Sequence, residues 1–408
     1  MKPQVRVSVY VVFGRHFKAV NNRVEHLGSL SSDSADYYLL TPGRKKLAPF
    51  HEPIIALPNI KRLLTKMGLK AFVPIVVQFM VDAKAPFMFS FFAKRKLARL
   101  ISKDLKEGRR VTLVTCFPPH SLGSVGVYLK AKFKDIRWIL DWQDLWTHDE
   151  NYINIIPPRL MGHARELEKS YFLNGDVHVT TNDYAKRVLE DKYNVPENKV
   201  VAVCHPYELD KIDDPKKFLS DFFSYVPGEK IRFGFMGALF KPPRVPGKEL
   251  VKAIVNLRKK YPQLELHVYG LPPASGDIES AIPANTLFFH EAVPHYQAIN
   301  LMTKYDFLLV LLADLENSKI VMSIKLPHYM VAGPPIIGIV PSDSFCEKFI
   351  MSTGAGFVVP VDSSWEQGMD KIIATYIKSG IKLIRNREVI EGYSLESFLK
   401  VWRKLCES

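Results

Sequence analysis

Charged and polar residues stand directly after apolar runs at several points of the chain. In "RWILDWQDLWT" (137–147) an apolar run leads into Asp141, and Asp144 follows. In "FGFMGALFKPPR" (233–244) an apolar run ends at Gly237, and cations follow at Lys241 and Arg244. A carboxylate at a strand end can serve as a general base, and a glycine followed by cations can hold a diphosphate. The alternatives are that both aspartates cap the following turn and that the basic loop is a solvated turn.

A third segment, "MSIKLPHYMVAGPP" (322–335), predicts a short helix near an anion site. Ser323 is the expected N-cap of a helix of about nine residues, and Gly333 with the two prolines after it ends that helix. Lys325 then lies at the positive end of the helix, where it would strengthen phosphate binding. His328 follows in the first turns, and the alternative for it is a packing histidine.

Two further segments that follow predicted strands are candidates for lining the ligand-binding cleft. They are His120 in "PPHS" and the loop Gly14, Arg15 and His16 after the first apolar run. A plain loop role is the alternative for each.

The elements that must position these residues alternate between strands and helices in both halves. Strands are expected at 5–13, 37–40, 111–116, 138–141 and 177–180, and again at 231–235, 264–269, 307–312, 335–340 and 356–360. Helices are expected between them, as at 121–133, 159–173, 183–193 and 246–260. Repeated βα alternation predicts parallel sheets covered on both faces, in which ligands lie beyond the carboxyl ends of the strands.

The chain of 408 residues is too long for one core, so we expect two domains. The fold class is α/β, with two Rossmann-like doubly wound domains facing across a cleft. The expected boundaries are 1–210 for the first domain and 211–392 for the second, since 211–230 loses strand character. A helix in 393–408, with one apolar face, is expected to pack back on the first domain.

The net charge of +14 is concentrated in one block. Residues 41–110 carry 16 lysines and arginines against 4 aspartates and glutamates, interleaved with Phe, Met, Val and Ile. This composition predicts an element that lies on an anionic membrane surface, and a solvated basic face is the alternative. No nucleic-acid motif accompanies the charge, so no nucleic-acid partner is expected.

Targeting and metal signals are weak. Arg6 interrupts the apolar start of the chain and no cleavage site follows, which favours a strand over a signal peptide. The longest apolar run, 71–81, is too short to span a membrane. The four cysteines are far apart with no metal-ligand spacing, so neither zinc nor a disulfide framework is expected.

The order of the motifs resembles the family-4-type glycosyltransferases of the GT-B fold, of the bacterial surface-polysaccharide type. The first matching piece is "CFPPHSLGSVGVYLKAKFKDIRWILDWQDLWT" (116–147), and "ARELEKSYFLNGDVHVTTNDYAKRVLEDKY" (164–193) and "FGFMGALFKPPR" follow. The next are "LHVYG" (266–270) and "HEAVPHYQAINLMTKYDFLLVLL" (290–312), and the last is "SIKLPHYMVAGPPIIGIVPSDS" (323–344). The chain is also similar to a membrane-associated glucuronosyltransferase of xanthan assembly.

The resemblance implies a role for each matching position. Gly237, Lys241, Arg244 and Lys325 would contact the donor diphosphate, and Tyr269 and Gly270 with the segment from Glu291 through Val293 would hold the base. Ser323, Leu326, His328 and Tyr329 would complete the donor site. His328 stands where the family usually has a glutamate for the donor ribose, and Ile320 stands at the upstream glutamate position, so the donor contacts are expected to be altered.

The resemblance implies that 1–210 binds the acceptor and 211–392 binds the donor. The catalytic residue it implies is Asp144, with His120 and the Gly14–His16 loop as further acceptor-side candidates. Asp141 is also on that side, but it still lies within the apolar run and is expected to hydrogen-bond the loop. In an inverting transfer Asp144 would be the general base, and in a retaining transfer it would orient the acceptor. Fixed cations would stabilise the leaving diphosphate without a metal, and no cofactor is expected beyond the UDP or GDP sugar that serves as substrate.

The resulting hypothesis is a glycosyltransferase on the cytoplasmic face of the membrane. It would move a sugar from a nucleoside-diphosphate donor to a lipid-linked or saccharide acceptor in surface polysaccharide biosynthesis. The alternatives are an epimerase-like GT-B enzyme on a soluble substrate and a non-catalytic nucleotide-sugar-binding protein.

Overall fold

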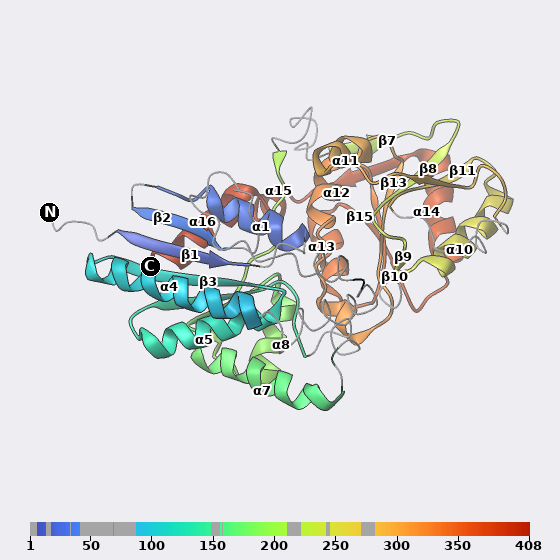
Figure 1. Ribbon diagram of the computed structural model, residues 1–408. Coiled ribbons are helices and arrows are strands. Elements are labelled where there is room, and N and C mark those ends of the chain that lie inside the picture. The colour runs from blue at the N-terminus through green and yellow to red at the C-terminus, as the bar shows by residue number, and fades with distance from the viewer. Residues whose placement is uncertain are drawn as a thin grey trace. The chain divides into compact units, whose positions relative to one another are not determined.

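The computed structural model describes residues 6–13, 18–32, 34–40, 68, 87–147, 156, 158–209, 222–241, 245–270 and 282–408. The chain forms two units (Figure 1). One comprises Met1–Cys204 with Phe398–Ser408, and the other comprises His205–Ser397. The GT-B class expected from the sequence requires a doubly wound α/β sheet in each unit, and both sheets are present.

The first unit is built on a parallel six-stranded sheet with the order β2-β1-β3-β4-β5-β6. The strands are β1 (Val7–Val12), β2 (Ala35–Leu40), β3 (Arg110–Phe117), β4 (Arg137–Trp142), β5 (Val177–Thr180) and β6 (Val200–Ala202). Figure 1 shows α1 (Lys18–Gly28) and α16 (Leu395–Glu407) on one face, and α4 (Phe87–Lys106), α5 (Gly123–Lys132) and α7 (Pro158–Asn174) on the other. Helix α8 (Asp183–Tyr193) packs on β5 and β6. The strand order reverses between β1 and β3, so a ligand is expected at the carboxyl ends of these strands.

The second unit has its own parallel sheet, with the order β12-β11-β8-β13-β14-β15. The strands are β8 (Ile231–Met236), β11 (Leu264–Tyr269), β12 (Leu287–His290), β13 (Phe307–Leu311), β14 (Ile336–Val340) and β15 (Gly356–Pro360). Helices α10 (Gly247–Lys260) and α14 (Trp365–Ser379) contact each other, as do α11 (His295–Met302) and α12 (Leu326–Ala332), and α12 also contacts α13 (Phe345–Thr353). Here the strand order reverses between β8 and β13.

Shorter elements complete the described chain. They are the antiparallel pairs β9 (Phe240–Lys241) with β10 (Val245–Pro246) and β7 (Phe222–Tyr225) with β16 (Ile381–Ile384), the helix α15 (Arg387–Glu391), and the 3-10 turns η2 (His120–Leu122), η3 (Glu197–Lys199) and η6 (Glu316–Ile320). No helix in the described ranges is long and apolar enough to cross a membrane.

Local signals explain where several helices begin and end. The Asn182 side chain accepts a hydrogen bond from Ala185 N at the start of α8, and Ser344 does the same for Glu347 N at the start of α13. Gly354 ends α13 in the left-handed conformation, with φ of +65°. These are the caps that polar residues and glycine supply in this position, so the chain alone sets these boundaries.

A buried ion pair joins α1 to β4 in the first unit. Arg23 Nε lies 3.0 Å from both carboxylate oxygens of Asp141, and neither side chain has exposed surface. Arg23 Nη1 also donates to Val203 O at 2.9 Å. On its face, the guanidinium contacts the rings of Phe398 (5.1 Å) and Trp402 (5.4 Å) of α16.

This geometry corrects the acceptor-side role predicted for Asp141. Burial raises the pKa of the Asp141 carboxyl, against the opposing charge and hydrogen bonds of Arg23. Because the carboxylate is fully enclosed and neutralises Arg23, it holds α1, β4 and α16 together.

Replacing Arg23 by methionine is expected to destabilise the first unit by about 3–5 kcal/mol, because Asp141 would remain buried without its counter-charge. Urea unfolding followed by tryptophan fluorescence reports mainly on this unit, since four of the five tryptophans (Trp138, Trp142, Trp146 and Trp402) belong to it and only Trp365 belongs to the second unit. The double variant Arg23→Met/Asp141→Leu is expected to lose less stability than the single variant. Equal losses would contradict the ion-pair assignment.

Candidate functional site

The reversal of strand order in the second unit brings the end of β8 beside β13. Gly237 follows β8 directly and has φ of +131°, a conformation that side chains rarely adopt. The β13–β14 connection carries η6 and α12, and Lys325 immediately precedes α12. The strand-end residues Gly237 and Lys325, both predicted from the sequence, therefore lie at the switch point of one sheet.

The loops after β8 and β11 touch through two glycines. A Cβ on Gly270 would lie 2.3 Å from Gly237 O, closer than real Cβ atoms approach. Gly237 N donates to Tyr269 O at 2.8 Å, and Gly270 N donates to His290 O at 3.2 Å. Only glycine at position 270 permits this backbone contact, so the loop geometry depends on it.

Lys325 faces this glycine contact. Its Nζ lies 3.6 Å from the position that a Cβ on Gly237 would occupy, and 4.0 Å from the centroid of the Phe235 ring. The side chain is half-buried, and burial lowers the pKa of its amine to about 8. Lys325 has no carboxylate partner in the described part of the chain. A partly desolvated cation without a counter-charge favours the binding of an anion.

The helix beside Lys325 is shorter than predicted. It spans Leu326–Ala332, its N-cap is Lys325, and no side chain caps it. The predicted N-cap, Ser323, instead accepts a backbone hydrogen bond at its carbonyl from Leu326 N (2.9 Å). This preceding turn, with Pro327 as the second residue of the helix, moves the start of α12 two residues downstream.

Three predicted donor residues on α12 are buried. Leu326 and Tyr329 have no exposed surface, and His328 is 4% exposed. The Tyr329 hydroxyl accepts a hydrogen bond from Met236 N at 2.9 Å, which ties α12 to the end of β8. His328 Nδ1 lies 3.2 Å from Ile324 O, so this nitrogen donates to the carbonyl. Tyr329 thereby fixes the carboxyl end of β8 through this hydrogen bond.

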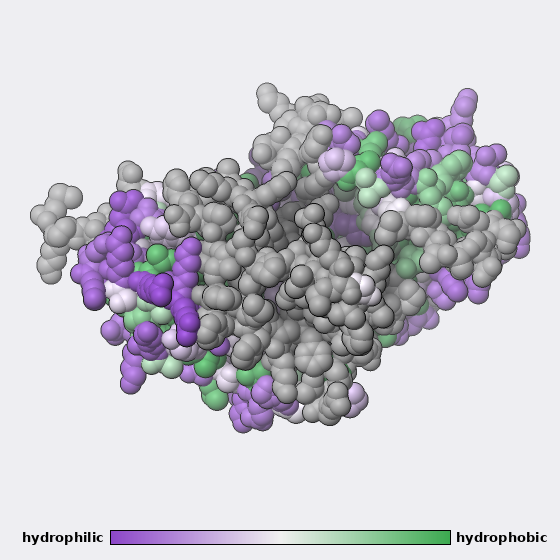
Figure 2. All heavy atoms as spheres, viewed as in Figure 1, coloured by the Kyte–Doolittle hydropathy of each residue, from purple (hydrophilic) through white to green (hydrophobic). Residues whose placement is uncertain are grey.

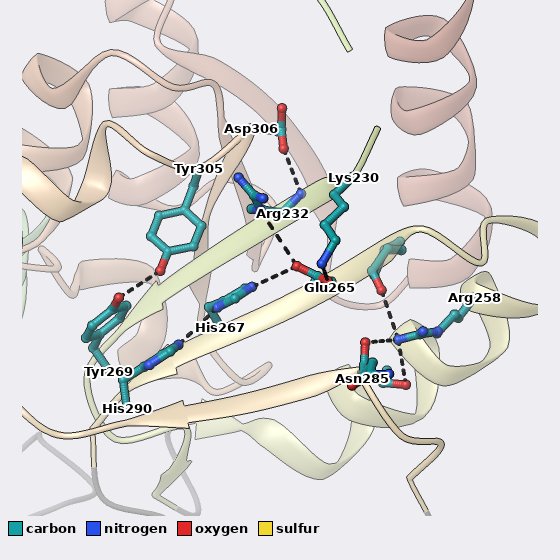
Figure 3. Close-up of polar contacts among 12 residues, drawn as sticks. Lys230, Arg232, Arg258, Glu265, His267, Tyr269, Asn285, His290, Tyr305 and Asp306 are labelled. Atoms are coloured by element: carbon teal, nitrogen blue, oxygen red, sulfur yellow. Dashed lines mark hydrogen bonds and ion pairs between the residues drawn. The ribbon is translucent and has the colours of Figure 1, made fainter. Parts of the chain in front are cut away.

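The predicted nucleoside side of the site lies at the ends of β11 and β12. The rings of Tyr269 and His290 stack, with centroids 4.5 Å apart and planes 18° from parallel. Between β12 and α11, Glu291 is exposed and Val293 is half-buried. Figure 3 shows Tyr269 and His290 side by side, with Tyr305 reaching Tyr269 from the start of β13.

Several predicted positions are not described. Gly14, Arg15, His16 and Arg244 lie outside the described residues, and so does most of the basic block before residue 87. Lys241 belongs to β9, but its side chain is not described. Their roles stay predictions.

In the first unit, the structure brings His120 and Asp144 together. His120 Nε2 lies 3.0 Å from Asp144 O, so the ring donates to that carbonyl. The His120 ring is fully buried and stacks on Trp146 at 5.3 Å, and burial lowers the pKa of His120 to about 3. His120 is therefore neutral, and it holds the loop that carries the half-buried Asp144.

A second buried residue, Glu168, fixes Thr147 of the same loop. The Glu168 carboxylate accepts hydrogen bonds from Thr147 N at 3.2 Å and from Tyr193 OH at 2.7 Å. Burial raises the pKa of Glu168, although these hydrogen bonds oppose the rise. The loop after β4 is thus held at Asp144 and at Thr147, which gives Asp144 a fixed backbone position.

Sequence reasoning missed several of these residues. It passed over Arg23 and Glu168, which contribute charges to buried positions, and it missed His290 because it did not predict β12. His267, which is hydrogen-bonded to His290, could have been found from the sequence. In "LELHVYG", polar side chains alternate within a strand of a parallel sheet that should be continuously apolar. In the described ranges, no group of three or more His, Cys, Asp and Glu side chains is placed to hold a metal ion.

Solved structures share this architecture. A glycosyltransferase from Rickettsia africae is 13% identical over 98% of both chains, with a TM-score of 0.63. An α,α-trehalose 6-phosphate synthase from Burkholderia multivorans is 11% identical over 98% of both chains, with a TM-score of 0.61. A UDP-GlcNAc 2-epimerase from Neisseria meningitidis, solved with bound UDP-GlcNAc, is 13% identical over 98% of this chain and 99% of that chain, with a TM-score of 0.51.

No protein-family model and no curated protein matches the sequence. At identities this low, the likeness to solved structures establishes the fold alone. The predicted fold class is confirmed, and the chain has the GT-B fold.

Proposed function

We propose that the protein is a glycosyltransferase that uses a nucleoside-diphosphate sugar. The observation that carries the proposal is the half-buried Lys325 ammonium, without a carboxylate partner in the described chain, which faces Gly237 at the switch point. This is where a doubly wound sheet binds its ligand. Two structures of similar fold support the assignment, one described as a glycosyltransferase and one bound to UDP-GlcNAc.

The chemical demand of such a transfer is the charge that grows on the departing diphosphate. A cation that is fixed before the reaction stabilises this charge without reorganisation, and loss of such a group commonly costs about 3–4 kcal/mol in the barrier. Lys325 meets this demand, and we propose that Lys241 and Arg244 add to it. In this scheme the leaving group needs no metal.

The nucleoside would extend from the diphosphate toward Tyr269, Gly270 and the segment from Glu291 to Val293. UDP and GDP are the bases to test first. The imidazole of His328 stands in place of a glutamate that accepts two hydroxyl hydrogen bonds, so we expect fewer ribose contacts on that side.

On the acceptor side, we propose Asp144 as the residue that handles the acceptor hydroxyl. Its backbone is held by His120, and the same loop is held at Thr147 by Glu168. A carboxylate on a fixed loop can take the proton of the attacking hydroxyl in an inverting transfer, or orient the hydroxyl in a retaining one.

An epimerase on a soluble nucleotide sugar is the second candidate, because the Neisseria epimerase shares the fold over almost its whole length. A binding protein without turnover is the third, because neither glutamate of the family pattern is present at Ile320 and His328. Conversion of UDP-GlcNAc without an acceptor would favour the epimerase. Donor binding without any conversion would favour the binding protein.

Donor affinity is expected to fall about tenfold between pH 7 and pH 9. The Lys325 pKa is about 8, so the ammonium that binds the diphosphate is mostly present at pH 7 and mostly lost at pH 9. Calorimetric titration with UDP and GDP measures this dependence. Lys325→Arg keeps its charge and should bind equally at both pH values, whereas Lys325→Ala should bind weakly at both.

Two results would contradict this assignment. If the wild type binds the nucleoside diphosphate equally well at pH 7 and pH 9, Lys325 does not bind the diphosphate. No heat with any nucleoside diphosphate at pH 7 would rule out the donor site and the proposed activity together.

Replacing Asp144 by asparagine is expected to leave donor affinity within twofold of wild type and to lower the transfer rate about 10²- to 10⁴-fold. The rate is measured as release of nucleoside diphosphate from the sugar nucleotide that binds best, with a membrane extract as the source of acceptor. Asp135→Asn, at an exposed position of the same unit, is the matched control. Full activity of Asp144→Asn would show that another group handles the proton.

We also propose that the enzyme works on the cytoplasmic face of a membrane, with a lipid-linked saccharide as acceptor in surface polysaccharide biosynthesis. In the described part of the basic block, α4 forms a groove against α5 whose charged lining residues are all basic. They are Arg95, Arg99, Lys103, Lys106 and Lys132, with Tyr128 beside them, and Lys103 lies 3.8 Å from Glu107 at the exposed end of α4. Figure 2 shows hydrophilic side chains gathered over this part of the molecule. A row of cations with an interfacial tyrosine suits anionic lipid headgroups.

Reversing two charges in this groove is expected to weaken membrane binding. Arg99→Glu/Lys103→Glu should reduce partitioning onto vesicles of phosphatidylglycerol and phosphatidylcholine at least about tenfold, at roughly 1 kcal/mol for each basic residue. Co-sedimentation at low salt measures it. Lys371→Glu/Lys378→Glu, on exposed positions of α14, makes the same change in net charge and should have little effect. Failure of the wild type to bind anionic vesicles would rule out the membrane proposal.

A further inference from the structure

A series of polar side chains runs along β11 in the second unit, from the start of the strand to its carboxyl end near the switch point. Glu265, His267 and Tyr269 alternate along β11, so they share one face of the sheet. His290 is the register partner of Tyr269 on β12. Figure 3 shows this series running from Lys230 and Glu265 through the two histidines to Tyr269.

The hydrogen bonds fix which nitrogen carries each proton. Burial disfavours the charge of Glu265, but hydrogen bonds from Lys230 (2.6 Å) and His267 outweigh this effect, so the pKa of Glu265 is lowered. Since the carboxylate only accepts, His267 Nε2 donates to it at 3.2 Å. The Nδ1 of a neutral His267 must then accept, so His290 Nε2 donates to it at 3.0 Å.

Both histidines are neutral near pH 7, because burial lowers the pKa of each ring. The ring geometry agrees with a rigid pair, in which the two imidazoles lie nearly in one plane and are joined edge to edge by their hydrogen bond. The His267 and His290 planes are 3° from parallel with centroids 5.2 Å apart, and His267 stacks on Phe288 at 4.8 Å. A single arrangement of protons therefore satisfies the whole series.

The series ends on the residues that build the glycine contact. The His290 ring lies under the Tyr269 ring, and Tyr305 donates to the Tyr269 hydroxyl at 3.0 Å. The Tyr269 carbonyl accepts from Gly237 N, and the His290 carbonyl accepts from Gly270 N. The orientation of Tyr269 and the path of the loop after β11 thus depend on His290.

We propose that His267 and His290 are positioning residues for the nucleoside part of the donor. They act through Tyr269 and Gly270, which they hold in the bound geometry before the ligand arrives. The inference rests on the proposed function, because it takes a nucleoside diphosphate as the ligand. It adds two residues remote from the diphosphate that control affinity for the nucleoside end alone.

Three variants test this proposal. His267→Phe keeps an aromatic ring stacked on Phe288 but removes both hydrogen bonds. His267→Gln restores one donor and one acceptor. Tyr305→Phe removes only the hydrogen bond to the Tyr269 hydroxyl. Thermal unfolding and circular dichroism identify any variant that has lost its fold.

Calorimetry with a nucleoside diphosphate and with inorganic pyrophosphate distinguishes contacts to the nucleoside from contacts to the diphosphate. His267→Phe is expected to bind UDP or GDP about tenfold more weakly, and Tyr305→Phe about threefold more weakly, while inorganic pyrophosphate binds all variants as it binds the wild type. His267→Gln should recover most of the affinity. In transfer assays, the KM for the donor should rise in His267→Phe and kcat should change less than twofold.

The outcomes distinguish this inference from the proposed function. If the wild type binds a nucleoside diphosphate and His267→Phe binds it equally well, the inference is wrong and the proposed function stands. Equal losses of pyrophosphate and nucleoside-diphosphate affinity in a folded His267→Phe would also overturn the inference. If the wild type binds neither ligand, the proposed function fails as well.

Discussion

The contact between Gly237 and Gly270 is the constraint on which the candidate donor site depends. Two strand-end loops can pass this closely only because Gly270 carries no Cβ, while Gly237 adopts a φ of +131° that side chains rarely allow. The backbone hydrogen bonds of Gly237 and Gly270 then hold the loops together. The space left above Gly237 is where the Lys325 ammonium points. The glycines therefore do two things, since they fix the backbone and they leave room for a ligand beside a cation.

Arg23 and Lys325 differ in how their surroundings compensate their charges. Arg23 is fully enclosed, and it contacts a carboxylate, a carbonyl and two aromatic rings. Lys325 is half-buried and has an aromatic ring but no counter-charge within the described chain. Burial of an unpaired cation is costly unless something compensates it. A diphosphate would supply that compensation only when it binds.

The candidate acceptor side and the candidate donor side are both supported by buried polar side chains. In the first unit, buried polar side chains from neighbouring elements, His120 and Glu168, hold the loop that carries Asp144. In the second unit, His290 and Tyr305 hold Tyr269. In both cases a neutral, stacked histidine is part of the support, and burial keeps it neutral. Such supports position a residue at a site without contacting the substrate.

The sequence by itself determined the α/β class, the strands that precede Asp144 and Gly237, and the presence of Lys325 near a helix start. These features follow from apolar periodicity and from glycine and proline signals, which act within a few residues of the chain. The sequence did not predict β12, because its four residues are all half-buried and their burial does not alternate. It placed the N-cap of α12 at Ser323, because helix propensity alone does not predict the turn that precedes the helix.

Only the tertiary structure decided which of these residues meet. The strand order places the β8 end next to the β13–β14 connection, and so brings Lys325 to Gly237. The packing of α1 on the sheet turned Asp141 from a predicted acceptor-side residue into the partner of Arg23. Contacts between distant segments depend on the order of the strands and on which side chain fills a shared space. Neither is encoded in the spacing of residues along one element.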